Sequence, residues 1–155
     1  MELLKAVLLR IYFDTCCYGR HCDYQQVARN AAETVAIATI IESARRGECC
    51  ILGSMAVINE MNRIKDAALH KDITDFYSAT AKETVILTIR ESMRAQVFQA
   101  AGIGVTDSLH LAAAESAGAA YLVTVDDDFV RIAANSRLSK VIVINPLTYL
   151  ARGIK

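Results

Sequence analysis

Four carboxylates occupy positions from which a fold could assemble a single acidic site: Asp14, Glu60, Asp107 and Asp126. Carboxylates gathered in one pocket repel each other, and a divalent cation relieves that repulsion. Ligation by oxygen alone favours Mg²⁺ or Mn²⁺, and Mg²⁺ typically keeps waters and completes its shell with substrate phosphate. One or two such ions can activate a water and stabilise the departing oxygen in phosphodiester hydrolysis.

Each of these acids has an ordinary structural explanation when it is taken alone. Asp14 follows a predicted strand, where a turn aspartate is common, and Glu60 suits a solvated helix surface. Asp107 is a routine carboxylate of a first helical turn, and Asp126 with the two aspartates after it could simply start a helix. When the four acids are considered together, at positions where open sheets bind ligands, a functional site is the better interpretation.

The elements that must position these acids alternate between short apolar, β-rich runs and helical patterns. Strands are predicted over residues 6–13, 49–52, 84–88, 120–124 and 141–144. Helices are predicted over residues 25–46, from a Ser54 cap through Glu60, over 67–80, 90–101, 107–117 with a Thr106 cap, 127–135, and from Pro146. The alternation predicts an α/β fold, a three-layer α/β/α sandwich around a mostly parallel five-stranded sheet.

The predicted elements bring the acids to one edge of that sheet. In an open parallel sheet, ligands bind beyond the carboxyl ends of the strands. Asp14 directly follows the first strand, and Asp126 follows the fourth. Asp107 is in the first turn of the helix before the fourth strand, where the helix dipole favours its ionised form, and Glu60 is on the helix after the second strand. The fold, rather than a local loop, would therefore assemble the site.

Length, charge and hydropathy restrict the class of protein. The chain has 155 residues and is 54% hydrophobic, which suits one domain over residues 1–155. Lys plus Arg equals Asp plus Glu at 17 each, so contact with a phosphate backbone needs a local patch or a bound cation. The sequence has neither a convincing signal peptide nor the ~18 apolar residues of a membrane span, so we expect a soluble, cytoplasmic protein without membrane contact. Apolar residues on more than one face of the helix over 25–46 predict a homodimer or another protein interface.

Cysteine and histidine offer further candidates for chemistry. The cysteines are Cys16, Cys17, Cys22, Cys49 and Cys50. An odd count argues against a disulfide framework, and the adjacent pairs lack C-x-x-C spacing, so buried reduced thiols are favoured over a zinc site. His110, one helical turn from Asp107, could contact substrate or transfer protons, but a packed or solvated helix histidine is the favoured interpretation.

The C-terminal third carries the strongest resemblance to a known family. The run T-D-S-L-H-L-A-A-A from Thr106 and the run A-A-Y-L-V-T-V-D-D-D-F that ends at Phe129 resemble a stretch of the PIN-domain (PilT N-terminus) family. The apolar strand that ends at Asp14 resembles the opening motif of the family, and the segment from Ile51 to Glu60 resembles its second motif. The resemblance covers about residues 11–144, and the order and spacing of the motifs add to its weight.

This resemblance implies a flavodoxin-like strand order 3-2-1-4-5, a Mg²⁺ or Mn²⁺ site and ribonuclease activity on RNA. The metal-site acids that it implies are Asp14, Glu60, Asp107 and Asp126, with Thr124 as a supporting hydroxyl and Asp128 as an additional acid. Many small members are VapC-like toxins of toxin–antitoxin pairs, which implies a small antitoxin as a partner. Two departures affect substrate contacts: Cys16 and Cys17 replace the usual polar-then-aliphatic pair, and residues 15–30 form a longer segment than in compact members.

Two alternative functions remain at this point. A receiver-like signalling module needs an aspartate at the end of the third strand and a lysine at the end of the fifth, whereas Thr88 ends the predicted third strand and Lys140 precedes the fifth. The stronger alternative is a catalytically inactive PIN-fold module that binds nucleic acid or a protein partner. The four intact acids argue against it.

Overall fold

The computed structural model describes residues 7–154, and a five-stranded sheet lies at its centre. The strands are β1 (Leu9–Phe13), β2 (Cys49–Ser54), β3 (Glu83–Val85), β4 (Tyr121–Val123) and β5 (Ile142–Ile144). They lie in the order β3-β2-β1-β4-β5, and every neighbouring pair is parallel. The predicted α/β class and strand order are confirmed.

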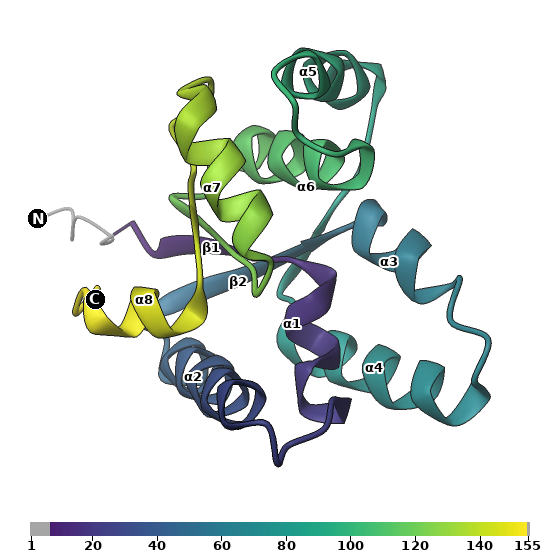
Figure 1. Ribbon diagram of the computed structural model, residues 1–155, viewed down its shortest axis with the longest axis vertical. Helices are drawn as coiled ribbons and strands as arrows, with labels where there is room; N and C mark the ends of the chain where they lie inside the picture. The colour runs from purple at the N-terminus through teal and green to yellow at the C-terminus, as the bar shows by residue number, and fades with distance from the viewer. Residues whose placement is uncertain (1–6, 155) are drawn as a thin grey trace, which may run out of the picture.

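Helices cover both faces of this sheet (Figure 1). They are α1 (Thr15–Gly19), the 3-10 helix η1 (Arg20–Cys22), α2 (Ala28–Arg45), α3 (Met55–Met61), α4 (Ala67–Thr80), α5 (Ile89–Ala100), α6 (Val105–Ser116), α7 (Asp127–Ser136) and α8 (Pro146–Ala151). Right-handed crossovers place the helices that lead from β1 to β3 on one face and those that lead from β3 to β5 on the other. In Figure 1, α5, α6 and α7 lie above the sheet, and α1, α2, α4 and α8 lie below it.

The central strand β1 carries the core and directs the chain toward the candidate site. Ile11, Tyr12 and Phe13 are fully buried, as expected for a parallel strand covered on both faces. Phe13 is in register with Val123 of β4, and the Asp14 amide donates to the Val123 carbonyl at 3.0 Å. The carboxyl ends of β1 and β4 therefore lie side by side, which brings the residues that follow them together.

Several predicted boundaries need correction. Residue 6 of the first predicted strand lies outside the described residues, and β1 begins at Leu9. β3 ends at Val85 rather than at Thr88, because Thr88 caps α5 in a capping box with Glu91. The prediction of a Thr106 cap is wrong: α6 begins at Val105, and the carbonyl of its N-cap residue Gly104 accepts the Ser108 amide at 2.8 Å. The tight turn that separates α6 from α5 leaves Thr106 inside the helix.

The segment after Asp14 contains two helices that the sequence did not predict, α1 and η1. Asp14 is the N-cap residue of α1, and its side chain accepts the Thr15 amide at 2.7 Å. Cys17 and Tyr18 are buried, and the Tyr18 ring packs edge-on against Phe13. These five helical residues therefore fix the direction in which the chain leaves β1.

The predicted surplus of apolar surface on the helix over 25–46 is present in part. Ile37, Ile40 and Ile41 of α2 are buried, whereas Val35 on α2 and its N-cap residue Val27 are 66% and 47% exposed. α8 packs along α2, and Tyr149 of α8 is buried. Within residues 7–154, no helix combines the length and hydropathy that a membrane span requires.

Candidate metal centre

Asp14 lies at the centre of the candidate site, at the end of β1, and is 6% exposed. Its Oδ1 accepts the Thr15 amide, and its Oδ2 accepts the Thr124 hydroxyl at 2.7 Å. The Cys16 thiol also donates to Oδ2 at 3.4 Å. Both carboxylate oxygens are therefore oriented by neighbouring groups, and the Thr124 contact spans β1 and the end of β4.

Glu60 and His110 form the second part of the site. Glu60 Oε1 accepts the Thr15 hydroxyl at 2.9 Å and also the Nε2 of His110. His110 is fully buried, and its Nε2 lies 3.3 Å from Asp14 Oδ1. The prediction of an ordinary helix histidine is therefore incomplete: His110 is packed in the core, but its imidazole bridges two of the predicted acids.

A buried chain of polar groups continues from His110 into the sheet. His110 Nδ1 lies 2.7 Å from the Tyr12 hydroxyl, which lies 2.6 Å from Ser54 Oγ at the end of β2. If the imidazole is neutral, both hydroxyls can donate toward Nδ1; if it is charged, Nδ1–H donates to Tyr12 and the chain reverses. The chain therefore holds the imidazole in either protonation state.

Neighbouring charges and hydrogen bonds raise the pKa of His110 and lower the pKa of Glu60. Burial alone would lower the pKa of His110, but the charge of Asp14 and the hydrogen bond to Glu60 raise the pKa above its ordinary value. Burial alone would raise the pKa of Glu60, but the hydrogen bond and the charge of His110 lower it below the ordinary value. Protonated imidazole beside ionised glutamate is the arrangement that the bare protein favours.

Asp107 lies in the first turn of α6. Burial raises the pKa of Asp107 to about 6, and the charges of Asp14 and Asp126 act in the same direction. The helix dipole, which favours an ionised acid at this position, does not prevent the shift. Asp107 is thus the acid whose charge is least well accommodated in the bare protein.

Asp126 and Thr124 belong to the loop between β4 and α7. Asp126 Oδ1 caps α7 by accepting the amides of Asp128 at 2.9 Å and Phe129 at 3.1 Å. Thr124 Oγ1 accepts the Asp126 amide at 3.1 Å while it donates to Asp14. Asp126 therefore does start a helix, as its position suggested. In addition, the Thr124 hydroxyl connects the Asp126 backbone to the Asp14 carboxylate.

The other predicted member, Asp128, points elsewhere. Its side chain is 79% exposed and pairs with Arg131 at 2.9 Å. The structure does not bring Asp128 into the acidic cluster. Cys16, two residues after Asp14, lies beside the cluster: its sulfur is 3.4 Å from Thr124 Oγ1 and accepts the Val125 amide at 3.4 Å.

A network of hydrogen bonds and ion pairs around Glu33, which the sequence did not predict, connects α2 to the loop that contains Asp126. Glu33 of α2 is fully buried and accepts hydrogen bonds from Arg20 at 2.7 Å, Arg29 at 2.8 Å and Asn145 at 2.8 Å. Arg29 also pairs with Asp127 at 2.6 Å. Glu33 therefore ties η1, α2 and α8 to the residue that follows Asp126.

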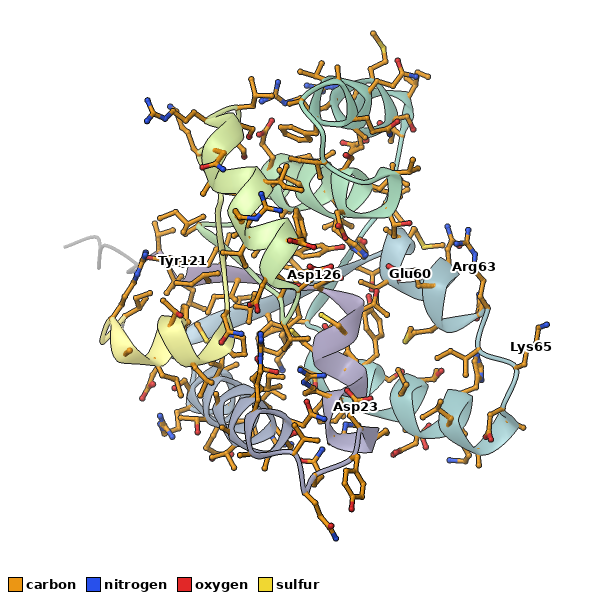
Figure 2. The ribbon with its side chains drawn as sticks, in the orientation of Figure 1. Asp23, Glu60, Arg63, Lys65, Tyr121 and Asp126 are labelled. Carbon is orange, nitrogen blue, oxygen red and sulfur yellow. The ribbon has the colours of Figure 1, made fainter. Side chains whose placement is uncertain are left out.

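The chemistry of the donor set fits a divalent cation. Ligating atoms of Asp14, Glu60 and His110 all lie within 4.8 Å of one another, and Asp107 and Asp126 contribute charge to the same neighbourhood. Within residues 7–154, none of the four predicted acids forms an ion pair with Lys or Arg. Figure 2 shows Asp126 at the start of α7 and Glu60 on α3. Gathered carboxylates without a Lys or Arg partner are a setting in which Mg²⁺ or Mn²⁺ binds, and His110 is the basic side chain that contacts Asp14 and Glu60 in the bare protein.

The acidic cluster opens on a groove between α1, η1, α3 and α4. This cavity has a volume of about 380 Å³ and is lined by Thr15, Cys16, Gly19, Cys22, Asp23, Glu60, Leu69 and Ile73. Thr15 and Glu60 belong both to the cluster and to the groove. Of the four predicted acids, Glu60 lines the groove, so a ligand there would meet this carboxylate directly.

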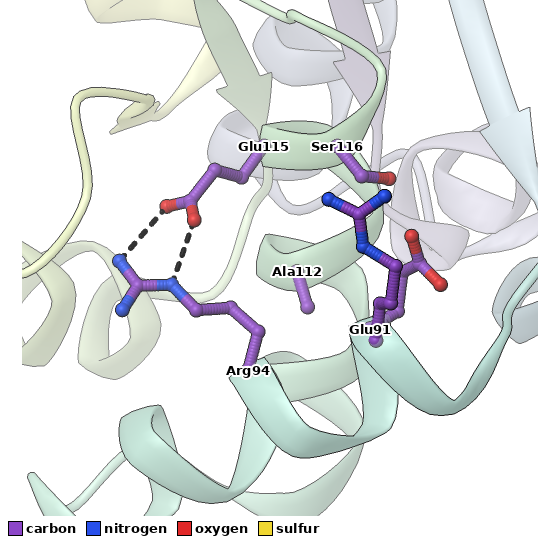
Figure 3. Close-up of a pocket in the computed structure, with 6 residues that line it drawn as sticks. Glu91, Arg94, Ala112, Glu115 and Ser116 are labelled. Carbon is purple, nitrogen blue, oxygen red and sulfur yellow. Dashed lines mark hydrogen bonds and ion pairs between the residues drawn. The ribbon is translucent and has the colours of Figure 1, made fainter.

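Another hollow of about 410 Å³ lies between α5 and α6 (Figure 3). Three of its charged groups have partners: Arg94 pairs with Glu115 at 2.7 Å, and Glu91 accepts the Thr88 amide at 2.7 Å. Arg90 also lines the hollow. None of the four predicted acids lines it. This hollow lies between two helices and is separate from the metal centre.

Fold and site together define a class: an α/β protein with an acidic centre at the carboxyl edge of a parallel sheet. Comparison with protein families matches residues 25–135 to the PIN domain, and the chain belongs to that family. PIN domains are generally nucleases that use divalent metal ions. The matched range begins after Asp14, so the family match and the geometry around β1 are separate observations.

Among solved structures, a chain of VapBC2 from Rickettsia felis, crystallised bound to a DNA fragment from their promoter, has a similar fold. The TM-score is 0.54 with 17% sequence identity, and the alignment covers 88% of this chain and 98% of that chain. No curated protein matches the sequence. Similarity at this level of identity supports the fold.

Proposed function

We propose that the protein is a cytoplasmic endoribonuclease that depends on Mg²⁺ or Mn²⁺, and that residues 1–155 form a single PIN-like domain. The observation that carries the proposal is the group of Asp14, Glu60, Asp107 and Asp126 at one sheet edge, with no Lys or Arg ion pair to any of them in the described chain. A protein that merely used these acids as caps and surface residues would not need to keep several of them in mutual repulsion.

In this proposal, Asp14 and Glu60 are the principal ligands, and Asp107 and Asp126 complete the acidic shell. A bound Mg²⁺ or Mn²⁺ would supply an activated water and charge stabilisation for the departing oxygen of the phosphodiester. Thr124 orients Asp14, and Thr15 and His110 orient Glu60. Such outer contacts fix ligand geometry and so influence both affinity and rate.

Contact with RNA needs local positive charge, because the chain as a whole is neutral. Arg63 and Lys65 lie between α3 and α4, just beyond Glu60, and extend outward in Figure 2. Both are exposed. We propose that these side chains meet the phosphate backbone of an RNA strand that enters the groove beside Glu60.

A toxin role with a small antitoxin partner, and a homodimer, are the finer parts of the proposal. They are supported by a row of exposed apolar side chains on and before α5: Ile86, Ile89, Met93 and Val97, which are 64%, 72%, 61% and 45% exposed. Ile89, Met93 and Val97 share one helix face through their i, i+4 spacing. The solved neighbour from Rickettsia felis is a VapBC2 assembly, which adds to the case for a protein partner.

The direct test of activity is cleavage of a single-stranded RNA by purified protein. Cleavage should require Mg²⁺ or Mn²⁺, stop with chelator and fail in Asp14→Asn. Cleavage that persists in chelator, or that survives Asp14→Asn unchanged, would reject the metal mechanism. RNA binding without cleavage at any metal concentration would favour the non-catalytic PIN-fold module instead.

The partner proposal has its own test. Light scattering on the purified chain should report a dimer, and Met93→Glu on the apolar row should shift the mass toward the monomer. The matched control Val35→Glu, on the exposed side of α2, should leave the mass unchanged. Coexpression with the product of an adjacent small reading frame should yield a complex. A strict monomer at high concentration that forms no complex would remove this part of the proposal without affecting the nuclease.

A further inference from the structure

A second group of ligating side chains includes Cys22, which lines the groove beside Glu60. His21 and Cys22 of η1 meet Asp72 of α4, although Asp72 is far along the chain. His21 Nε2 lies 3.1 Å from Asp72 Oδ2, and the Cys22 sulfur lies 3.2 Å from the same oxygen. The Cys22 sulfur is also 3.3 Å from His21 Nε2. One nitrogen, one sulfur and one oxygen therefore form a nearly equilateral triangle.

The dimensions of this triangle match one face of a small coordination tetrahedron. Zinc binds thiolate sulfur at about 2.3 Å and imidazole nitrogen or carboxylate oxygen at about 2.0–2.2 Å. At tetrahedral angles, these bond lengths separate the ligand atoms by about 3.3–3.6 Å. The observed separations of 3.1–3.3 Å need to open by only a few tenths of an ångström.

The surrounding chain holds the three groups in place. The His21 ring packs against Phe76 with 4.9 Å between ring centroids. Gln25 Nε2 donates to the carbonyls of Arg20 and Asp23, which bracket the two ligands. His21 Nδ1 is buried without a hydrogen-bond partner among the described residues, so Nε2 is the ring nitrogen that the cluster can use. The site is thus formed before any ion binds.

The site is also open to solvent on one side. The side chain of Asp72 is 59% exposed, that of His21 is 31% exposed, and Cys22 is an exposed residue. An ion can therefore reach the three ligands directly, and a water can occupy the fourth position. The expectation of buried thiols is confirmed for Cys17 and Cys49, whereas Cys16 and Cys50 are only partly buried. It is wrong for Cys22, which is exposed beside a histidine.

We propose that His21, Cys22 and Asp72 form a binding site for a zinc-like divalent cation, distinct from the carboxylate centre. Thiolate and imidazole ligands select Zn²⁺ or Co²⁺ over Mg²⁺, whereas the carboxylate centre favours the harder ions. Binding forms a metal–sulfur bond and releases the thiol proton to solvent. The ion would join η1 to α4, the two elements that line the groove together with α1 and α3. This inference does not depend on the nuclease proposal.

Cobalt(II) provides the test, because a cobalt–thiolate bond gives a charge-transfer band in the near ultraviolet that oxygen ligands do not give. The protein is titrated with Co²⁺ in the presence of excess Mg²⁺. We expect one equivalent to produce the band in the wild type and the band to be lost in Cys22→Ser. The matched controls Cys16→Ser, beside Asp14, and Cys50→Ser, on β2, should retain it. No band in the wild type, or a band that survives Cys22→Ser, would overturn the proposal.

Thermal melting with zinc gives an independent readout. At a Zn²⁺ concentration a hundred times the dissociation constant, the Tm of the wild type should rise by about 5–10 °C. Cys22→Ser and Asp72→Asn should show little of this rise. Melting of each variant without metal checks that it folds. An equal zinc response in the wild type and in both variants would assign the binding to other residues and refute the site.

Discussion

Glu33 is fully buried and Asp107 is partly buried, and the charges around the two acids differ. Glu33 accepts hydrogen bonds from two arginines and an asparagine, and although burial acts to raise its pKa, these partners lower it below the ordinary value. Burial raises the pKa of Asp107 to about 6, and its acidic neighbours act in the same direction. In the first region two arginines face one carboxylate. In the second, the single imidazole of His110 is shared between Asp14 and Glu60, and it lowers the pKa of Asp107 less than burial and the neighbouring acids raise it. A buried acid with enough positive charge around it stabilises the structure, whereas a cluster of acids with too little positive charge is a candidate cation site.

The largest expected effect is on the rate of RNA cleavage, which should depend on the acidic cluster. Asp14→Asn should lower the rate of RNA cleavage by about a thousandfold, because metal-assisted hydrolysis depends on several kcal/mol of charge stabilisation at such a centre. Single-turnover cleavage assays at saturating Mn²⁺ measure it. Asp128→Asn is the matched control, since its carboxylate pairs with Arg131 on the surface, and its rate should stay within about twofold. Equal losses in both variants would remove the distinction between clustered and surface acids.

The second expected effect is on the free energy of unfolding, which should depend on the Glu33 network. Glu33→Gln should lower the free energy of unfolding by about 3 kcal/mol, because it leaves Arg20 and Arg29 without their shared buried partner. Urea denaturation gives the value. Glu42→Gln, which weakens an exposed pair with Arg45, should cost less than about 0.5 kcal/mol. If Glu33→Gln behaved like this control, the Glu33 network would not be what holds η1, α2 and α8 together.

A smaller effect concerns the pH dependence of the bare protein. The pKa of Asp107 rises from 3.8 to about 6 on folding, so the folded state binds the extra proton more tightly and stability falls as pH rises through that window. Such a shift corresponds to about 3 kcal/mol at most, and the partial exposure of the side chain reduces this to roughly 1–2 kcal/mol.

Asp107→Asn removes this charge and keeps the shape of the side chain. In chelator, the variant should therefore match the wild type in stability near pH 4 and exceed it by roughly 1–2 kcal/mol near pH 7. Urea denaturation at both pH values tests the prediction. A constant difference between the two proteins across this range would show that Asp107 does not carry a raised pKa.

Much of the fold was predictable because it depends on patterns that extend over many residues. The helix over residues 67–80 was predicted at its true boundaries, since α4 has several turns of amphipathic sequence and an Asp66 cap. α1 and η1 were missed because helices of five and three residues are too short to show a period. The sequence favours Thr106 as the cap of α6 because side-chain caps leave a recognisable residue type, whereas Gly104 caps the helix with its backbone alone.

The site also contains residues that the sequence pattern predicts and contacts that only the packed structure reveals. Asp14 and Asp126 were predictable because they follow strands, and the carboxyl ends of parallel strands share an edge. The contacts of His110 were not, because they depend on how α6 packs against β1 and α3; its position one turn after Asp107 was the available signal. The partners of Glu33 come from η1, α2 and α8, and no local pattern connects those segments.

The central claim is that the acids around Asp107 form a divalent-metal site, and paired unfolding measurements test it most directly. Wild type and Asp107→Asn are melted in chelator and with Mg²⁺ or Mn²⁺ at a hundredfold excess over the dissociation constant. The wild type should gain about 2.7 kcal/mol by mass action, and the variant should gain much less. In chelator, the variant should be at least as stable as the wild type, because one repelling charge has been removed. Equal gains in the two proteins, or no gain in either together with a less stable variant, would contradict the claim and leave Asp107 as an ordinary first-turn residue of α6.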